Sequence, residues 1–406
     1  MYSLPSLLQI LSFLILASFS VAAPLLKKDL ASYDPNSAFQ SALNATWSTF
    51  WNYQYNSFSA NDPTCQGAEF TSPVVWDIAV AGRALTDSGD QAKINAAVQN
   101  LLQYRRTDGW FSASTAKDGD VYVDDNSQVL WVFVDAFKVT GNQDYLDVAQ
   151  RLMVLIRSQW NSQSGGVQWK LDGDYIASIS TSEAALAAVR LYEVSPDPDL
   201  VYFAQDCLNW LYSNLQDPAD YLFYDGLTAS TGVVNKGKLT YTVGTALSTL
   251  AYLNKFTGSN SFIVSAVALG YAAAGGKGAF YGSNGYWNNQ LQYVHLLFAG
   301  IADLVNIGVA ANSQQSAAFG NFASEAKRNG AYIYTYLQLG NSGNYLSSVT
   351  SGPQSMFSKY ATAFQGTGSY SPDSTYFCGG NVSGAVSRSF MDDSSAAQVF
   401  YEITRL

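Results

Sequence analysis

Apolar residues recur at helical spacing along almost the whole chain, while the alternation typical of strands is scarce and never sustained. The stretch that follows residue 125 illustrates the pattern, with Val129, Leu130, Val132, Phe133 and Phe137 on one side of a helix. The hydrophobic pattern therefore predicts an all-α protein.

Five short polar turns separate neighbouring helical patterns. They lie at residues 87–90, 140–144, 195–199, 257–261 and 311–314. A Gly or Pro ends one helix, and a side chain such as Asn or Asp can cap the next. The turns recur roughly every 50–60 residues, which is the length of two helices plus one long loop. The chain is thus predicted to be a series of helical hairpins.

Five or six hairpins are compatible with an (α/α)6 barrel or with an α-solenoid. Long loops rich in Gly and aromatic residues favour the barrel, at residues 105–124, 165–176, 222–238 and 275–289. These loops fall on the same side of each helix pair, so they are expected to gather at one end of the barrel. Loops held by a rigid scaffold at one end are a frequent place for binding and catalysis.

Composition narrows the possible partners. Of 406 residues, 48% are hydrophobic and only 13% are charged, so much of the surface must be uncharged and polar. The net charge of -10 and the sequence pI of about 4.5 would repel a phosphate backbone. Nucleic acid is therefore excluded as an expected partner.

The N-terminus has the pattern of a secretory signal peptide. An apolar run over residues 7–21 ends in the small residues Ala22 and Ala23, so residues 1–23 are assigned to this signal. Residues 24–35, which include Lys27-Lys28, are assigned to a short pro-segment or a disordered N-terminus, and residues 36–406 to the catalytic domain. A membrane anchor is the alternative, but no second apolar span follows. We expect a secreted, extracellular monomer without a stable membrane anchor.

Two glycosylation sequons and three cysteines fit secretion. The sequons begin at Asn44 and Asn381. Cys207 lies in an apolar helical pattern and is expected to be buried and free. We expect Cys65 and Cys378 to form a disulfide that ties the two ends of the domain together.

The adjacent pair Asp124 and Asp125 is the leading candidate for catalysis. It ends a long loop and begins a periodic helix, so the first Asp can still be extended and both can face one cleft. Hydrolysis of a glycosidic bond requires two carboxyl groups, one at the anomeric carbon and one that protonates the leaving oxygen. The alternative is that Asp125 is a helix cap and Asp124 its solvated neighbour.

Aromatic residues in the same loops favour a carbohydrate site, because Trp and Tyr combine a flat apolar ring with a polar group. They are Trp110, Phe111, Tyr122, Trp169, Tyr175, Tyr221, Tyr224, Tyr241, Tyr281, Tyr286 and Trp287.

In the order of these motifs the chain resembles glycoside hydrolase family 76, the endo-α-1,6-mannanases and their fungal cell-wall relatives. The motifs are Val123-Asp124-Asp125 with Trp131, Gly165-Gly166-Val167-Gln168-Trp169, Asp225-Gly226-Leu227, and Thr240-Tyr241 with Gly244. The resemblance implies an (α/α)6 barrel that cleaves α-mannan with retention. We expect neither a cofactor nor a metal. Asp124 would be the nucleophile and Asp125 the general acid/base.

The resemblance also implies that Trp169, Asp225 and Tyr241 bind substrate. Trp110 and Tyr122 are predicted to bind substrate as well, because they lie in the same aromatic-rich loops. The chain departs from the family beside Trp169, where Gln168 and Lys170 stand, and after Tyr241, where Thr242-Val243 replaces an Asn-Gln pair. The exact sugar is therefore less well determined than the reaction.

The other candidate residues are weaker. The single histidine, His295, lies in an apolar helix and is expected to be structural, and no spacing of ligands predicts zinc. Glu183 begins an Ala-rich helix and could support the acid indirectly, while Asp392-Asp393 is expected to be a cap or a solvated turn. Three other functions remain open. They are a cell-wall transglycosidase with the same Asp pair, an inactive carbohydrate-binding relative, and a hydrolase of unsaturated uronides, which would need basic residues in the cleft.

Overall fold

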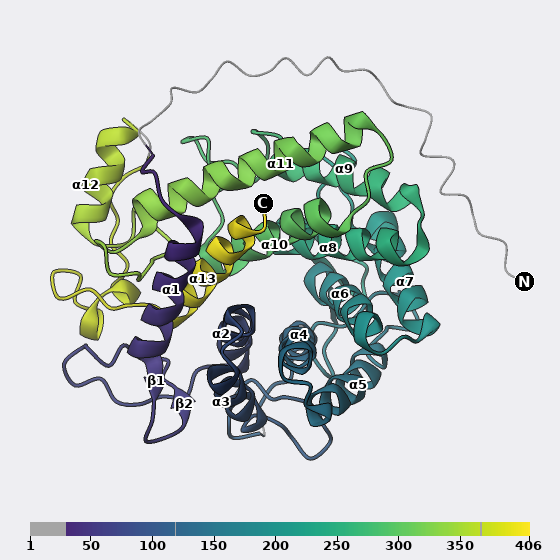
Figure 1. Cartoon of the computed structure of the whole chain (residues 1–406), viewed down its shortest axis with the longest axis horizontal. Coiled ribbons are helices and arrows are strands. Elements are labelled where there is room, and N and C mark those ends of the chain that lie inside the picture. Colours follow the sequence, from purple (N-terminus) through teal and green to yellow (C-terminus); the bar gives the residue numbers. More distant parts are fainter. Residues whose placement is uncertain (1–29, 118, 366–367) are drawn as a thin grey trace, which may run out of the picture.

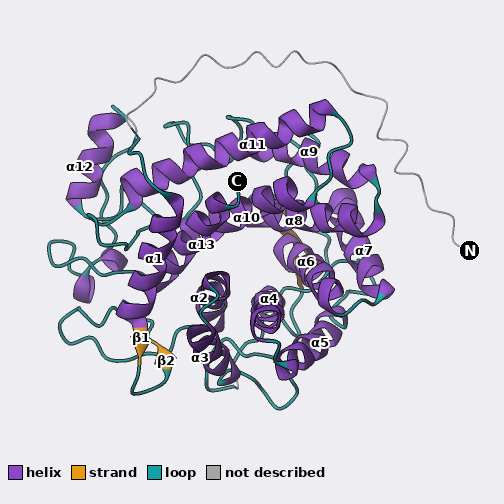
Figure 2. Cartoon of the chain, in the orientation of Figure 1, coloured by secondary structure: helices purple, strands orange, loops and turns teal. Residues whose placement is uncertain are grey.

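The computed structural model describes residues 30–117, 119–365 and 368–406, and most of this part is helical (Figure 1 and Figure 2). The predicted signal peptide, residues 1–23, lies outside the described residues, as do residues 24–29. The signal peptide therefore stays a prediction.

Six helices form a closed inner ring, in which each packs against the next and α13 packs against α2. They are α2 (Val75–Ser88), α4 (Val123–Thr140), α6 (Ser178–Val194), α8 (Thr240–Thr257), α10 (Leu291–Ile307) and α13 (Phe390–Thr404). Closure of this ring distinguishes the fold from a solenoid, whose ends do not meet.

An outer helix packs on each inner one, as Figure 1 shows. They are α3 (Gln91–Leu102), α5 (Gln143–Arg157), α7 (Pro198–Asn214), α9 (Asn260–Ala274), α11 (Ser313–Tyr332) and α1 (Pro35–Phe50). The last pair joins the two ends of the chain, because the N-terminal α1 packs on the C-terminal α13. The predicted all-α (α/α)6 barrel of helical hairpins is confirmed.

The five predicted polar turns are the connections from inner to outer helices. Gly89, Gly141 and Gly258 follow α2, α4 and α8 in the left-handed conformation, each with φ near 70°, where a residue without Cβ is favoured. Asp90 and Asn142 then cap α3 and α5 through their side chains. Because these turns are short, the long outer-to-inner loops all fall at the opposite end of the barrel.

Small residues let the inner helices approach closely. On Gly244 of α8, a Cβ atom would lie 2.0 Å from the carbonyl oxygen of Leu296 in α10. On Gly300 of α10, it would lie 2.2 Å from the carbonyl oxygen of Gly244. A substitution at either glycine would therefore push the two helices apart.

The remaining elements are short and lie in the loops. A hairpin is formed by β1 (Trp51–Asn52) and β2 (Ser57–Phe58), and an antiparallel sheet of order β3-β4-β5 by β3 (Tyr175–Ala177), β4 (Gly226–Thr228) and β5 (Val234–Asn235). A π-helical turn (Ile333–Leu337) extends α11, α12 spans Gln354–Ala363, and 3-10 turns span Ser374–Tyr376 and Cys378–Gly380. The three-stranded sheet joins the loop before α6 to the loop before α8.

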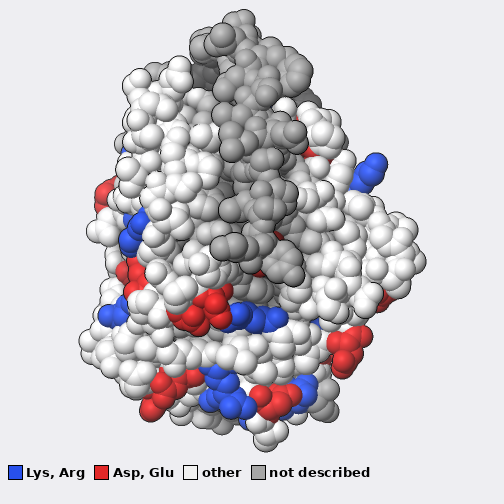
Figure 3. Space-filling view, turned by 90° about the vertical axis from the view of Figure 1, so that its right-hand side faces the viewer, with Lys and Arg blue, Asp and Glu red and all other residues white. Residues whose placement is uncertain are grey.

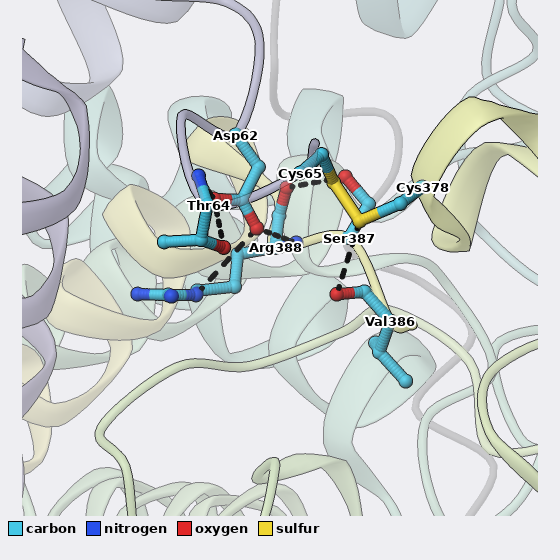
Figure 4. The surroundings of a disulfide bond; sticks show 7 residues. All are labelled: Asp62, Thr64, Cys65, Cys378, Val386, Ser387 and Arg388. Carbon is cyan, nitrogen blue, oxygen red and sulfur yellow. Dashed lines mark hydrogen bonds and ion pairs between the residues drawn. A yellow bond between two sulfur atoms is a disulfide. The ribbon is translucent and has the colours of Figure 1, made fainter. Parts of the chain in front are cut away.

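A disulfide joins Cys65 and Cys378 across 313 residues of sequence, as predicted (Figure 4). Cys207 is buried and free. Next to the disulfide, the backbone N–H of Arg388 donates a hydrogen bond of 2.8 Å to Asp62 Oδ2, and the Arg388 guanidinium forms an ion pair with the same carboxylate. The disulfide and the ion pair hold the α1–α2 loop to the segment before α13.

Residues 30–34 require a correction to the predicted N-terminal segment. The Tyr33 ring stacks on Tyr334 with the centroids 4.6 Å apart, and the N–H of Ala31 donates to the hydroxyl of Thr335 at 3.0 Å. These contacts hold residues 30–34 against the end of α11, so they belong to the folded domain and not to a disordered segment.

The surface agrees with the low charge content. On the face shown in Figure 3, most described residues are uncharged, and acidic and basic side chains lie beside one another in its lower part. Asn44 and Asn381 are both exposed, as glycosylation would require. Their glycosylation stays a prediction. Of the helices in the described part of the chain, none has the length and hydropathy needed to cross a membrane.

Buried carboxyl groups lie in the first turns of two inner helices. Asp392 and Asp393 of α13 are buried, where they accept hydrogen bonds from the backbone N–H groups of Ser347 and Tyr345. The prediction of a solvated turn there was wrong, because the segment that contains Tyr345 and Ser347 covers the start of α13. Burial raises the pKa of Asp392 to about 6, and burial together with Asp392 raises the pKa of Asp77 in α2 to about 7.

These raised pKa values predict that the protein is less stable at neutral than at mildly acidic pH. A carboxyl whose pKa is higher in the folded state adds stability below its ordinary pKa near 4 and loses it as the pH rises through the folded value. We therefore expect the melting temperature to fall by a few degrees between pH 4.5 and pH 8. Scanning calorimetry across this range measures it, and Asp77→Asn should flatten the fall. A melting temperature that rises steadily toward pH 8 would contradict the assignment.

Candidate active site

A cavity with a volume of about 610 Å³ opens at the loop end of the barrel. Five of the six inner helices contribute to its wall through their first turns or the residue before them. The wall consists of Val74, Trp76, Ala113, Tyr122, Asp124, Asp125, Gln128, Trp169, Tyr175, Ala177, Ile179, Glu183, Asp225, Asn235, Tyr241, Gln292, Tyr293 and Leu296. Its volume is typical of sites for small ligands.

Asp124 and Asp125 both line this cavity from the first turn of α4. Tyr122 is the extended residue that precedes the helix, with φ −100° and ψ 136°, so both aspartates are already helical. The expectation that the first would be extended is therefore wrong. Side chains about 100° apart still reach one cavity, because the first turn has no preceding turn to cover it.

The start of α4 is held in place from two sides. The N–H of Val123 donates to the carbonyl oxygen of Trp169 at 2.8 Å. The buried side chain of Asn126 accepts from the N–H of Phe111 at 2.9 Å and donates to the carbonyl oxygens of Phe111 and Tyr122 at 3.0 and 2.7 Å. Asn126 thereby fixes the loop before the aspartates to the helix that carries them.

Asp124 accepts two hydrogen bonds that favour its charged form. Trp169 Nε1 donates to Asp124 Oδ2 at 2.9 Å, and the N–H of Asp125 donates to Asp124 Oδ1 at 3.1 Å. Burial raises the pKa of Asp124 to about 7, and these two donors act against the rise. Asp124 therefore ionises near neutral pH.

Asp125 has a different environment. Burial is the largest cause that raises its pKa well above the ordinary value, followed by the charges of Asp124 and Asp77. Within the described part of the chain, no hydrogen bond to its carboxyl group opposes this. The surroundings thus separate the pKa values of the two carboxyl groups. As the pH rises, Asp124 loses its proton first, while Asp125 keeps its proton.

Glu183 of α6 is a third carboxyl in the cavity wall and is fully buried. Its Oε1 atom accepts a hydrogen bond of 3.0 Å from Gln128 Nε2, and its Oε2 atom has no partner among the described residues. Burial, followed by the charge of Asp124, raises its pKa well above the ordinary value. A neutral Glu183 can therefore present an O–H group.

Asp225 is positioned by the three-stranded sheet. Its Oδ2 atom accepts from the hydroxyl of Tyr175 at 2.6 Å and from Asn235 Nδ2 at 2.9 Å. The three residues lie at the start of β3, just before β4 and at the end of β5, so the antiparallel register brings them together. Asp225 is thus a fixed acceptor of hydrogen bonds in the cavity wall.

Aromatic rings form two groups in the wall of this cavity. Trp169, which is 40% exposed, lies 4.9 Å from the Tyr122 ring and meets Tyr175 edge to face at 6.3 Å. Tyr293 lies 5.3 Å from Tyr241 and 6.3 Å from Trp76, all between ring centroids. The cavity therefore offers flat apolar surfaces next to the carboxyl groups.

Six of the seven predicted site residues line this one cavity, and Trp110 does not. Trp110 is 4% exposed and belongs to the hydrophobic core. A bridge between Arg105 and Phe111 folds this loop back on itself, which turns Trp110 inward. Its prediction as a substrate-binding residue was therefore wrong.

The sequence interpretation missed several wall residues, among them Trp76, Gln128, Asn235 and Tyr293. Three of these four fall within the first two turns of an inner helix, so the start of each predicted inner helix was the available signal. Asn235 had no such signal, since its place depends on pairing between β4 and β5.

The described wall of the cavity holds four carboxyl groups, those of Asp124, Asp125, Glu183 and Asp225. It holds no Lys or Arg. His295 is buried in α10 with Nδ1 at 3.0 Å from the carbonyl oxygen of Leu291, and burial lowers its pKa to about 3. In the described residues no group of His, Cys, Asp and Glu is arranged to hold a metal ion. The chemistry available at this site is that of carboxyl groups.

Comparison with known proteins places this site in a family. Residues 36–328 match the model of glycosyl hydrolase family 76. The meiotically up-regulated gene 191 protein of Schizosaccharomyces pombe is 33% identical over 216 residues, which cover 45% of this chain and 48% of that protein. The chain thus matches about half the length of this curated relative.

Solved structures share the fold at low identity. An α-mannanase of the same family from Bacteroides thetaiotaomicron has a TM-score of 0.70 at 16% identity over 92% of this chain and 96% of its own. An α-1,6-mannanase from Salegentibacter, solved with α-1,6-mannotriose as an inactive variant in which two consecutive aspartates are asparagines, has a TM-score of 0.68 at 16% identity over 91% and 99%.

Dfg5 from Chaetomium thermophilum, solved with glucosamine, has a TM-score of 0.63 at 12% identity over 93% of this chain and 92% of its own. At such identities the likeness shows the fold. The family match extends over well more than half of the 406 residues, and the chain belongs to glycosyl hydrolase family 76.

Proposed function

We propose that this protein is a secreted hydrolase that cleaves α-1,6-mannosidic bonds within mannan by a retaining mechanism with two carboxyl groups. The observation that carries the proposal is the pair Asp124 and Asp125 in one aromatic-lined cavity, with surroundings that make one ionise before the other. The inactive Salegentibacter variant adds support, because two consecutive aspartates were replaced in an α-1,6-mannanase of this fold.

In the first step, an oxygen of Asp124 forms a bond to the anomeric carbon as the glycosidic bond breaks, and Asp125 gives its proton to the leaving oxygen. In the second step, Asp125 takes a proton from a water molecule whose oxygen attacks the anomeric carbon, and Asp124 is released. Asp124 suits the first role because the N–H groups of Trp169 and Asp125 stabilise its charge. Asp125 suits the second because it retains its proton.

The walls of the cavity suit a neutral sugar chain. Two groups of rings, Trp169 with Tyr122 and Tyr241 with Tyr293 and Trp76, offer apolar surfaces, and Asp225 offers a fixed acceptor. The uronide alternative would need basic groups near the substrate, and the described wall has none.

A transglycosidase is the second candidate, favoured by the shared fold with Dfg5 and by the fungal relative. It would use the same Asp pair, with a sugar hydroxyl in place of water in the second step. Incubation of the purified protein with linear α-1,6-mannan distinguishes the two when reducing ends and product sizes are followed. Short oligosaccharides support hydrolysis, products longer than the starting chains support transfer, and an unchanged polymer would refute the substrate.

Replacing either catalytic aspartate by asparagine should abolish most activity. Asp124→Asn removes the nucleophile and Asp125→Asn the proton donor, and each should lower kcat on α-1,6-mannan by about 10²–10⁴-fold. The assay is release of reducing ends, with circular dichroism to check the fold. Asp144→Asn is the matched control, because Asp144 lies in the first turn of the outer helix α5, away from the cavity. Near-full activity in either catalytic variant would remove the role assigned to that residue.

Trp169→Phe should move the acid limb of the pH profile to higher pH. The substitution keeps a ring beside Tyr122 but removes the N–H donor to Asp124, and loss of a donor to the charged form raises a carboxyl pKa. We expect the acid limb of kcat/KM to shift upward by roughly half to one pH unit. Tyr122→Phe is the control, since its hydroxyl binds Asp120 and not Asp124. A limb that stays in place or moves downward would contradict the role of Trp169.

Glu183→Gln should keep the enzyme active, because glutamine imitates a neutral carboxyl group in size and can still accept from Gln128. We expect kcat/KM within about threefold of the wild type below pH 7, and a larger loss for Glu183→Ala, which leaves the amide of Gln128 without its partner. Initial rates of mannan cleavage between pH 4 and 9 give both comparisons. If Glu183→Gln is as inactive as Asp124→Asn, Glu183 acts as a charged group and the neutral assignment is wrong.

A further inference from the structure

A second cavity of about 250 Å³ lies at the same end of the barrel, on the other side of α10. Leu291 and Val294 of α10 line this second cavity, whereas Gln292, Tyr293 and Leu296 line the catalytic cavity. The first turns of one helix therefore separate the two spaces. A helix with its side chains is about 10–12 Å across, so the two cavities lie within reach of one oligosaccharide.

Asn289 links the two cavities. It lines the second cavity, and its Oδ1 atom accepts from the N–H and the hydroxyl of Thr240, at 2.9 and 3.0 Å. Thr240 begins α8, and the next residue, Tyr241, lines the catalytic cavity. The wall of the second cavity is thus hydrogen-bonded to the residue that precedes Tyr241 in the wall of the catalytic cavity.

The lining of the second cavity is polar and uncharged. Among the described residues it contains amides and hydroxyls, such as Asn284, Asn288, Ser348 and Thr350, and no Asp, Glu, Lys or Arg. This contrasts with the catalytic cavity, which has four carboxyl groups. A site with both donors and acceptors but no charge matches a neutral polyhydroxy compound better than an ion.

Aromatic rings give the cavity a firm apolar side. Tyr332 lines it and stacks on Tyr286 with the centroids 4.5 Å apart. Trp287 also lines it, and its indole N–H is held by the carbonyl oxygen of Ala273 at 3.1 Å. Both rings are buried and fixed in the free protein. Binding of a ring-shaped ligand against them therefore costs little side-chain entropy.

Most of this lining comes from the C-terminal part of the chain. The residues from Asn329 to Gly368 that line it lie beyond residues 36–328, which match the family model. They come from the end of α11, from the loop around residue 350 and from α12. The shared segment of the family therefore does not form this cavity by itself.

We propose that the second cavity binds one further neutral hexose unit of the glycan chain that the active site cleaves, which gives the enzyme a preference for longer chains. This rests on the proposed function. The volume, less than half that of the catalytic cavity, suits one sugar ring rather than several. A chain that leaves the active site past Gln292 and Tyr293 crosses the exposed start of α10 and reaches Asn288 and Asn289.

The test compares linear α-1,6-manno-oligosaccharides of increasing length, from two to eight units. Thr350→Val removes a hydroxyl at constant shape. Asn288→Ala removes an exposed amide whose Nδ2 donates to the carbonyl oxygen of Ala279 at 3.5 Å and whose Oδ1 accepts from Asn289 Nδ2 at 3.1 Å. The double variant should lose about three- to tenfold in kcat/KM on the longest substrates and nothing on the shortest that is cleaved. Thr362→Val, an exposed position of α12 outside the cavity, is the control.

Equal behaviour of the double variant and the wild type at every length would overturn the proposal, as would an equal loss at every length. Binding of the eight-unit oligosaccharide to Asp124→Asn/Asp125→Asn, with and without the cavity substitutions, gives a readout that needs no turnover. Calorimetry should show a three- to tenfold weaker Kd with them. A wild type that leaves α-1,6-mannan intact refutes the proposed function, whereas an unchanged Kd refutes the second site.

Discussion

Closure of the inner ring directs the starts of its helices toward one space, and the site depends on that geometry. The ring closes where small residues allow it, as at Gly244 and Gly300, whose Cβ atoms would collide with the facing backbone. The short turns then lie at one end and the long loops at the other, so five inner helices present their first turns to the same cavity. The carboxyl groups approach one another because the backbone places them there.

The same geometry determines how those groups titrate. A helix start favours a negative charge by about 0.3–1 kcal/mol, which is less than one pKa unit. Burial acts in the opposite direction and prevails, since the pKa of Asp124 rises from 3.8 to about 7. The described wall holds no cation to restore the balance. The difference between the pKa values of Asp124 and Asp125 therefore has a local cause. Asp124 accepts hydrogen bonds from two N–H donors, and Asp125 has no such donors.

The helical hairpins could be predicted from the sequence because each depends on local signals, such as Gly141 and the cap Asn142. The sequence also identified Asp124, Asp125, Trp169, Asp225 and Tyr241, which the fold brings to one cavity. It failed where burial depends on distant packing. Trp110 lies in a loop that folds inward, and Asp392 is covered by the distant segment that contains Ser347. Neither fact is visible in the residues that surround them in sequence.

Because the described wall has carboxyl groups but no Lys or Arg, its carboxyl groups must differ in their protonation states. If all three carboxyls near Gln128 were ionised, their mutual repulsion in a buried space would exceed what the available donors can offset. With Asp125 and Glu183 protonated, each becomes a hydrogen-bond donor, and Asp124 is left as the one charge that the Trp169 N–H must stabilise. A neutral sugar adds no charge to this arrangement, whereas an anionic one would add a further negative charge to a described wall without Lys or Arg. The electrostatics of the wall therefore favour the neutral substrate of the proposed function, and the proposed roles of nucleophile and acid follow from the order in which the two aspartates lose their protons.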